Sequence, residues 1–308
     1  MTSLRAHMLD AMMRWHVKRK LGRVTEVEDV RRALGPPRLK PPRGITVTPG
    51  TLGGVSGEWV AADDVPARAT LLYLHGGGYI ACSPATHRPI TMAYARRGLR
   101  VFAPDYRLAP ENPYPAAVQD AAAAYRGLRD APERVGRIVT GGDSAGGGLA
   151  LAMMLMLRDA GEGLPAAAAL FSPWTDLAVT GGTIESNTRW DAMFTGAIIR
   201  RGPEAYLGGA DPYAPLASPL YADLAGLPPL LIHAGAREVL LDDSRRLADR
   251  ARAAGVAVTL GVWPVLPHVW QLAQGFVPEA ARSLDEAAAF LLAAAADAGD
   301  ARDTRSAA

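Results

Sequence analysis

The chain has 308 residues, of which 49% are hydrophobic, and its 33 basic and 31 acidic side chains leave a formal charge of +2. A chain of this length buries about three quarters of the surface of its unfolded form, so it has enough apolar material for one large core. The near balance of charge argues against nucleic acid or an acidic polymer as a partner. The only cysteine, Cys82, cannot form an intrachain disulfide, so nothing in the fold requires an oxidising compartment and the cytoplasm is expected.

The N-terminal segment is predicted to form an amphipathic helix. Arg5, Asp10 and Arg14 interrupt its apolar residues, so no apolar run has the length of a signal peptide. No segment is long enough to span a bilayer, so stable membrane insertion is not expected. One helical face is apolar and is expected to pack on the body of the protein rather than lie on a membrane surface; it carries Leu4, Met8, Ala11, Met12 and Trp15.

From about residue 70 onwards, short apolar runs alternate with helical stretches, which is the pattern of a mostly parallel sheet flanked by helices. The expected buried strands are Thr70–Leu74, Leu99–Ala103, Arg137–Gly141, Ala166–Phe171, Pro229–Ala234 and Val256–Val262. The expected helices between them are Thr86–Arg97, Ala116–Arg129, Gly146–Ala160, Asp243–Ala254 and Glu279–Ala295. The predicted fold class is therefore α/β.

Two segments break this alternation and are predicted to be additions to the core. The second of them contains a helical stretch near Ala192–Arg201, and a long insertion in a compact chain is more often a lid than a structureless loop. The predicted organisation is N-terminal cap helices at 1–43, a core in two parts at 44–177 and 227–296, a cap insertion at 178–226 and a disordered tail at 297–308.

The strongest chemical signal is the pentapeptide Gly142-Asp143-Ser144-Ala145-Gly146, which follows an apolar strand and opens a helix. The glycines leave room for a sharp turn that holds Ser144 in a strained conformation at the N-terminus of that helix, where negative charge is stabilised. Such a string also occurs by chance, as a helix cap with small packing residues. The order of strand, turn and helix favours a nucleophile at Ser144.

A second signal is His75-Gly76-Gly77-Gly78, directly after the strand at 70–74. Acyl transfer creates an oxyanion, and donors already aimed at it are worth about a hundred- to a thousand-fold each in rate. The expected donors are the N–H groups of Gly77, Gly78 and Ala145. A flexible turn or a phosphate-binding loop is the alternative, but the Lys-Ser/Thr of a P-loop and the spacing of a dinucleotide site are missing.

The base is predicted to be His268. Of the six histidines, it alone follows the last expected strand, where a chain order of serine, acid and histidine places the base. A structural histidine is the alternative.

The acid is predicted to be Glu238, in the loop after the strand at 229–234. The 30 residues from Glu238 to His268 accommodate one helix and one strand, which returns both loops to the same sheet edge. Asp242 and Asp243 compete for this role, although capping of the following helix suits them better. Asp176, after the preceding strand, is a lesser alternative.

These motifs resemble those of the bacterial hormone-sensitive-lipase-like (family IV) carboxylesterases, which have the α/β-hydrolase fold. The resemblance covers roughly residues 40–295. The matching strings, in order, are His75-Gly-Gly-Gly-Tyr79, Asp105-Tyr-Arg-Leu-Ala-Pro-Glu111 with Tyr114-Pro-Ala116, Gly142-Asp-Ser-Ala-Gly146, Ser172-Pro-Trp-Thr-Asp176, Glu238 with Asp242, and Leu266-Pro-His268.

The resemblance implies that both irregular segments form a cap over an acyl pocket and that the substrates are short- to medium-chain esters. It also implies a homodimer, which is common among such esterases. Glutamate replaces the more usual aspartate at the acid position, as in subgroups of the family. Candidates to line the pocket are Tyr79 and, on an expected cap helix, Trp190, Met193, Phe194 and Ile198; the alternative is that they form the packed face of the cap.

Three further features surround these motifs. Arg107 and Glu111 belong to a polar string that is interpreted as a structural loop, with Asp120 as a partner for the arginine. Cys82 stands where a glycine is expected and either lines the pocket or is a small buried hydrophobe. The apolar Val265-Leu266 pair before the histidine is expected to shape the acyl or the alcohol side of the pocket.

The predicted function is serine carboxylesterase. In this hypothesis His268 takes the proton of Ser144, an acyl-enzyme forms and is hydrolysed, and Glu238 stays ionised, so no metal or cofactor is needed. Activity is expected to fall as the pH drops through about 6.5. Amide or N-acetyl hydrolysis by the same residues is an alternative, as is a hydrolase-like protein that binds a ligand without turnover.

Overall fold

A single mixed β-sheet forms the centre of the computed structural model, which describes residues 2–24, 26–35 and 40–303. Over these residues the sheet has eight strands in the order β1-β2-β4-β3-β5-β6-β7-β8. The β1–β2 hairpin runs antiparallel and pairs antiparallel with β4, and all other pairs are parallel. The strands are β1 (Ile45–Leu52), β2 (Val55–Ala62), β3 (Ala69–Leu74), β4 (Leu99–Pro104), β5 (Ile138–Asp143), β6 (Ala168–Phe171), β7 (Leu230–Gly235) and β8 (Val258–Trp263).

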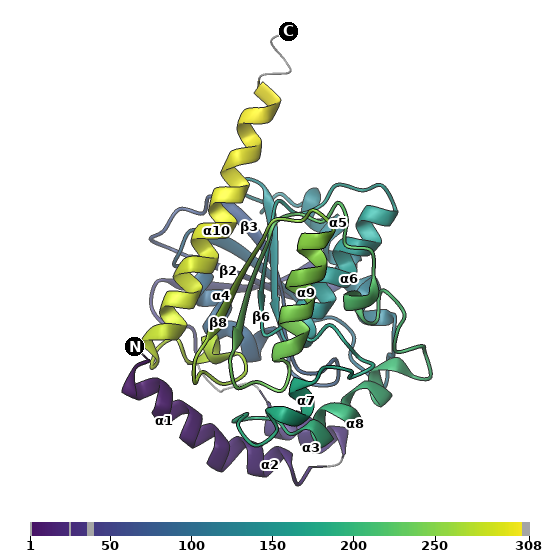
Figure 1. Cartoon of the computed structure of the whole chain (residues 1–308). Helices are drawn as coiled ribbons and strands as arrows, with labels where there is room; N and C mark the ends of the chain where they lie inside the picture. Colours follow the sequence, from purple (N-terminus) through teal and green to yellow (C-terminus); the bar gives the residue numbers. More distant parts are fainter. Residues whose placement is uncertain (1, 25, 36–39, 304–308) are drawn as a thin grey trace.

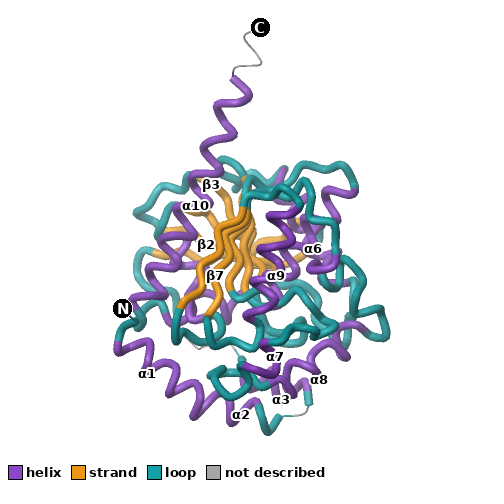
Figure 2. The backbone as a smooth tube through the Cα atoms, in the orientation of Figure 1, coloured by secondary structure: helices purple, strands orange, loops and turns teal. Residues whose placement is uncertain are grey.

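Helices cover both faces of the sheet (Figure 2). One face packs against α4 (Arg88–Ala95) and α10 (Pro278–Asp303). The other packs against α5 (Ala116–Arg129), α6 (Ala145–Asp159) and α9 (Leu241–Ala253). Alternate residues of β3 enter the two cores, Leu71 on the first side and Leu72 on the second. Burial on both faces explains why the strands in the middle of the sheet are continuous apolar runs.

Two segments far apart in the sequence lie together at one end of the sheet (Figure 1). The N-terminal one consists of α1 (Leu4–Met13), the π-helical turn η1 (Arg14–Lys18), α2 (Arg19–Leu21) and α3 (Val27–Ala33). The other lies between β6 and β7 and contains α7 (Thr183–Ser186), α8 (Gly196–Leu207) and the 3₁₀ turn η3 (Pro219–Tyr221). Two further 3₁₀ turns precede α4 and α10, η2 (Pro84–His87) and η4 (Trp270–Ala273). The division of the chain into cap and core domains stays a prediction.

Charged side chains of the N-terminal helix bind the second segment through its backbone. Arg14 donates to the carbonyl oxygens of Arg189 and Trp190, at 2.7 and 2.6 Å. Lys18 donates to those of Thr188 and Asp191, at 2.6 and 2.7 Å. These contacts hold the two segments together.

The expected packing face of the first helix is wrong. Leu4, Met8, Met12 and Trp15 are exposed, with 51–76% of their surface accessible. The opposite side of the helix, with Leu9, is buried instead. The helix is apolar on two sides, so the repeat of apolar residues alone could not identify which side packs.

Two expected helix boundaries also differ. The helix predicted from Ala192 begins at Gly196, because the Thr195 hydroxyl caps it by accepting from the N–H of Ile198. The tail expected to be disordered from 297 is helical as far as Asp303, in agreement with the high helix propensity of its alanines. Residues 304–308 of that tail lie outside the described residues.

Candidate active site

Ser144 occupies the sharp turn between β5 and α6. Its φ of 52° and ψ of −124° are a strained combination for a residue with a side chain. The turn passes so close to the end of β3 that a β-carbon at Gly146 would overlap the carbonyl oxygens of Leu74 and His75. Glycine at 146 is therefore required by the packing, and the strained serine stands at the N-terminal end of a helix.

His268 and Glu238 follow β8 and β7 and meet at the same edge of the sheet. Nδ1 of His268 lies 2.7 Å from Oε2 of Glu238, and both side chains are almost fully buried. The other carboxylate oxygen accepts from the Ser172 hydroxyl, at 2.7 Å, and from the Gly235 N–H. With Nδ1 bound to the carboxylate, Nε2 of His268 is buried without a hydrogen-bond partner among the described residues.

The competing aspartates have other partners. Asp243 accepts from the N–H groups of Thr175 and Asp176, and Asp242 accepts from the N–H of Thr183. Asp176 forms an ion pair with Arg246 at 2.9 Å. In the described part of the chain, Glu238 is thus the carboxylate that contacts the imidazole of His268.

Glu238 changes the titration of His268. Burial alone would lower the pKa of the imidazole, but the charge and the hydrogen bond of Glu238, together with the charges of Asp191 and Asp143, outweigh it and hold the pKa above 6.5. The pH at which activity falls is therefore expected to lie above the value of a free histidine.

The Gly-rich loop after β3 lies against the serine turn. Gly77 has a φ of 123°, and its carbonyl oxygen accepts from the N–H groups of Ile80 and Ala81 at 3.2 and 3.0 Å. A β-carbon at Gly77 would overlap the backbone of Ala81, so the tight turn requires glycine. Gly77, Gly78 and Ser144 all line one pocket. This placement suits the predicted role of the loop, which is to hold an oxyanion. The assignment of the Gly77, Gly78 and Ala145 N–H groups as its donors stays a prediction.

A buried cluster that the sequence analysis missed supports this turn from beneath. The carboxylate of Asp143 accepts from the Tyr73 hydroxyl at 2.7 Å and binds Nε2 of His87 at 3.1 Å. Burial raises the pKa of Asp143, but His87 and Tyr73 reverse that effect and keep it below its usual value. The signal that could have revealed this cluster is Asp143 itself, an acidic residue at the end of an apolar strand.

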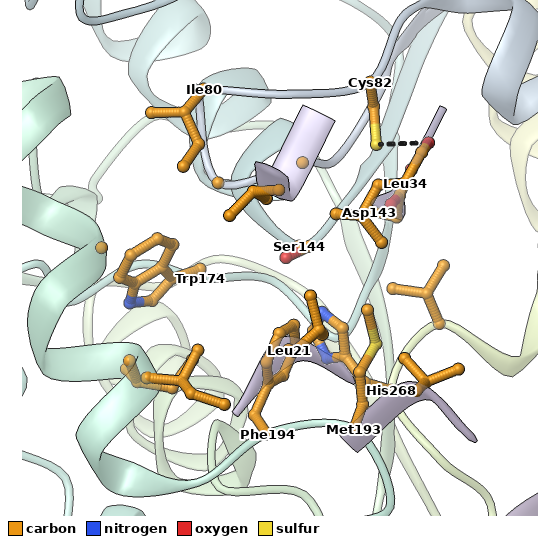
Figure 3. Close-up of a pocket in the computed structure, with 18 of the residues that line it drawn as sticks. Leu21, Leu34, Ile80, Cys82, Asp143, Ser144, Trp174, Met193, Phe194 and His268 are labelled. Carbon is orange, nitrogen blue, oxygen red and sulfur yellow. Dashed lines mark hydrogen bonds between the residues drawn. The ribbon is translucent and has the colours of Figure 1, made fainter. Parts of the chain in front are cut away.

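The pocket has a volume of about 800 Å³ and is lined by residues of the core, of the N-terminal segment and of the segment between β6 and β7. Figure 3 shows Ser144 and His268 in it, together with Met193, Phe194 and Leu21. Phe194 packs edge-on against the imidazole, with 5.1 Å between ring centres. Three of the predicted lining residues, Met193, Phe194 and Ile198, line the pocket, and all but Ile198 precede α8 rather than lie on a helix.

Two predicted lining residues lie elsewhere. Tyr79 is buried behind the Gly-rich loop, where its ring stacks on Tyr206 at 3.8 Å between centres. A φ of 63° at Tyr79 accompanies this turn of the chain. Trp190 is 46% exposed, and the guanidinium of Arg189 lies over its ring. Neither residue lines the pocket.

Asp191 was also missed by the sequence analysis. One of its carboxylate oxygens accepts from the N–H groups of Met193 and Phe194, at 2.7 and 2.8 Å. The other accepts from the N–H of Val239, at 2.8 Å, next to Glu238. This carboxylate joins the pocket wall to the loop that carries the acid, and a buried aspartate in a loop has no sequence pattern that would reveal it.

The polar string at 105–111 has the structural role expected of it. Arg107 forms a two-pronged pair with Asp120, with a closest approach of 2.7 Å. Glu111 binds Arg31 of α3, which also donates to the carbonyl oxygens of Ile80 and Ala109. The string thereby fastens the N-terminal segment to the end of the Gly-rich loop.

The two remaining features are resolved by packing. Cys82 lines the pocket, and burial raises the pKa of its thiol to about 12, which disfavours the thiolate. Leu266 does not line the pocket; it packs beneath α1 with Leu9 and Trp270. Leu266, in the loop before His268, therefore supports α1.

Comparisons with known proteins agree with this arrangement. A model of the α/β-hydrolase fold matches residues 71–272. An acetyl-hydrolase of Streptomyces hygroscopicus is 48% identical over 245 residues, 78% of this chain and 81% of the relative. An esterase of Acinetobacter venetianus is 35% identical over 248 residues, 80% and 82% of the two chains. The crystal structure of an esterase from the bacterial hormone-sensitive lipase family superimposes with a TM-score of 0.88 at 41% identity, covering 96% of this chain and 99% of that one. The chain belongs to the bacterial hormone-sensitive-lipase-like carboxylesterases of the α/β-hydrolase fold.

Proposed function

We propose that this esterase hydrolyses short- to medium-chain carboxylic esters through an acyl-enzyme on Ser144. The observation that carries the proposal is the Glu238–His268 hydrogen bond, which leaves Nε2 of His268 free in the pocket that also holds Ser144. A neutral imidazole with its proton on Nδ1 can accept the serine proton at Nε2. The strained serine turn places the Ser144 side chain in the pocket at the N-terminal end of a helix.

In the proposed reaction, the Ser144 oxygen attacks the ester carbonyl as its proton passes to Nε2 of His268. The negative charge on the carbonyl oxygen is stabilised by the N–H groups of Gly77, Gly78 and Ala145. As the carbon–oxygen bond to the alcohol breaks, His268 returns the proton to the leaving alcohol. Water then attacks the acyl-enzyme and gives a proton to the same histidine. As the bond between the acyl carbon and the Ser144 oxygen breaks, His268 returns that proton to the serine and the carboxylic acid is released. Glu238 stays ionised and stabilises the imidazolium.

The preference for short to medium acyl chains is supported by one relative and by the pocket. A related esterase, EstE5, has 38% identity and a TM-score of 0.88, and its crystals were soaked with p-nitrophenyl butyrate. The walls that Met193, Phe194 and Ile198 contribute here are apolar. Names of relatives are mainly esterase or carboxylesterase, so amide or N-acetyl hydrolysis is not favoured. We propose the cytoplasm as the compartment, since the single cysteine forms no intrachain disulfide.

The test is hydrolysis of p-nitrophenyl esters from acetate to palmitate, with wild type and Ser144→Ala measured side by side. Turnover of the short esters that disappears in the variant would support the proposal. Cys82→Ala is the matched control, because it alters the other nucleophilic side chain in the pocket. Loss of turnover in Cys82→Ala with retention in Ser144→Ala would overturn the assignment of the nucleophile.

A further inference from the structure

The outer side of the N-terminal helix carries an unusual row of exposed apolar side chains, here called the outer stripe: Leu4, Met8, Met12 and Trp15. These residues are spaced at three to four positions and so share one face of the helix. Their exposed fractions are 76%, 53%, 51% and 61%. They account for four of the nine large apolar side chains that are exposed in the described part of the chain. Figure 1 shows α1 at the outer edge of the molecule.

Cations flank the outer stripe. The guanidinium of Arg19 lies 3.7 Å from the centre of the Trp15 ring, and that of Arg5 lies 5.9 Å from the ring of Phe276, itself 41% exposed. Lys20 is exposed as well. Asp10 is the only acidic residue among the first 24, and it is buried and paired with Arg14. The patch is therefore apolar in the middle and positively charged at its edges.

The same helix faces the pocket on its other side. Leu9 and Met13 of α1, and Val17 after it, line the cavity that holds Ser144. A helix that only closed a pocket would need one apolar side, with polar residues facing water. The outer stripe is thus not explained by the packing of the cap, and it exposes apolar surface that is otherwise unfavourable in water.

We propose that the outer stripe is a docking surface for a lipid surface with anionic headgroups. Exposed leucine, methionine and tryptophan side chains enter the boundary between headgroups and acyl chains, while arginine and lysine at the edge bind the phosphates. A second copy of this chain fits less well, because two such patches face to face would bring arginines of like charge together. Docking in this orientation would place the helix that walls the pocket directly on the lipid.

The proposal can be tested without any reaction, by sedimentation of the full-length protein with vesicles. The vesicles are phosphatidylcholine alone or phosphatidylcholine with one third phosphatidylglycerol. We expect binding to the anionic vesicles, weaker binding to the neutral ones, and weakening by salt. Met8→Gln/Met12→Gln/Trp15→Gln is expected to lose at least about tenfold in affinity. Arg5→Gln/Arg19→Gln is expected to lose about fivefold for each cation removed.

Tyr213→Gln is the matched control, because Tyr213 is an exposed aromatic residue outside the outer stripe, between α8 and η3, at 51% exposure. It should bind like wild type, and all variants should keep the wild-type turnover of p-nitrophenyl acetate, which shows that they fold. Absence of anionic-vesicle binding by active wild type would refute the proposal, as would equal binding by the outer-stripe variant. A wild-type dimer that becomes a monomer in that variant, without vesicle binding, would show that a second copy covers the face instead.

Discussion

Replacing Glu238 by glutamine tests the proposed acid most sharply, because the structure determines how the new amide must sit. One carboxylate oxygen of Glu238 accepts from Ser172 and Gly235, and the other faces Nδ1 of His268. A glutamine keeps its oxygen toward the two donors, so its NH₂ group points at the imidazole. Nδ1 must then accept a hydrogen bond, and the imidazole proton moves to Nε2.

In that tautomer the nitrogen facing Ser144 already carries a proton and cannot act as a base. The cost of this change in such triads is about 10⁴ in kcat, which corresponds to roughly 5 kcal/mol of transition-state stabilisation. The pH profile gives a second readout. Since Glu238 raises the pKa of His268, removal of its charge lowers that pKa. The residual activity of Glu238→Gln should therefore begin to fall at a lower pH than that of wild type.

The assay is kcat for p-nitrophenyl butyrate across the pH range, with Asp242→Asn as the control. Asp242 was one of the competing acids in the sequence analysis and accepts from the N–H of Thr183. It should retain kcat within about twofold and leave the acid limb unchanged. A loss of less than tenfold in Glu238→Gln, or an acid limb that moves to higher pH, would contradict the assigned role.

Three smaller changes are expected to have graded effects. Ser172→Ala removes a buried hydrogen-bond donor to Glu238, and such a bond to a charged group is worth about 1.5–3 kcal/mol. The kcat should therefore fall about ten- to a hundredfold. An unchanged kcat would mean that this hydroxyl does not hold the carboxylate. Phe194→Ala opens the pocket wall and should lower kcat/KM for p-nitrophenyl butyrate about tenfold, whereas Trp190→Ala, outside the pocket, should stay within twofold; equal effects would place the wall elsewhere. Arg107→Gln breaks the half-exposed pair with Asp120 and should lower the free energy of unfolding by about 1 kcal/mol at unchanged kcat, as measured by denaturant unfolding; a large fall in kcat at unchanged stability would contradict a structural role.

The parts of the site that depend on backbone shape could be predicted from the sequence. Glycine strings mark the places where the chain turns too tightly for a side chain, as at Gly77 and Gly146. Loops that follow parallel strands lie at the same edge of the sheet, so the order of strands and helices shows which loops come together. The geometry agrees with that reasoning at Glu238 and His268, which lie 30 positions apart and whose side chains come within 2.7 Å.

The sequence could not show which apolar side chains face the pocket, which face the core and which face the solvent. Trp190 was expected in the pocket as part of a cap helix, with Tyr79 on the opposite side of the cleft. Tyr79 has a left-handed backbone conformation and its side chain lies in the core instead. Trp190 lies outside the pocket, beside Arg189. The outer stripe was expected to pack on the body of the protein. Periodicity shows which residues share a face of a helix but not what that face contacts.

Hydrogen bonds to the backbone join the N-terminal and insertion segments to the loops that carry the proposed catalytic residues, and such bonds leave no apolar pattern in the sequence. Lys18 holds the carbonyl oxygen of Asp191, and the carboxylate of that residue holds the N–H groups of Phe194 and Val239. Phe194 packs on the imidazole of His268, and Val239 directly follows Glu238. One chain of contacts from the N-terminal segment to both proposed catalytic loops therefore passes through Asp191. A polar group with three or more partners in such a position is costly to disturb, because each partner left unpaired in the interior loses its hydrogen bond without gaining water.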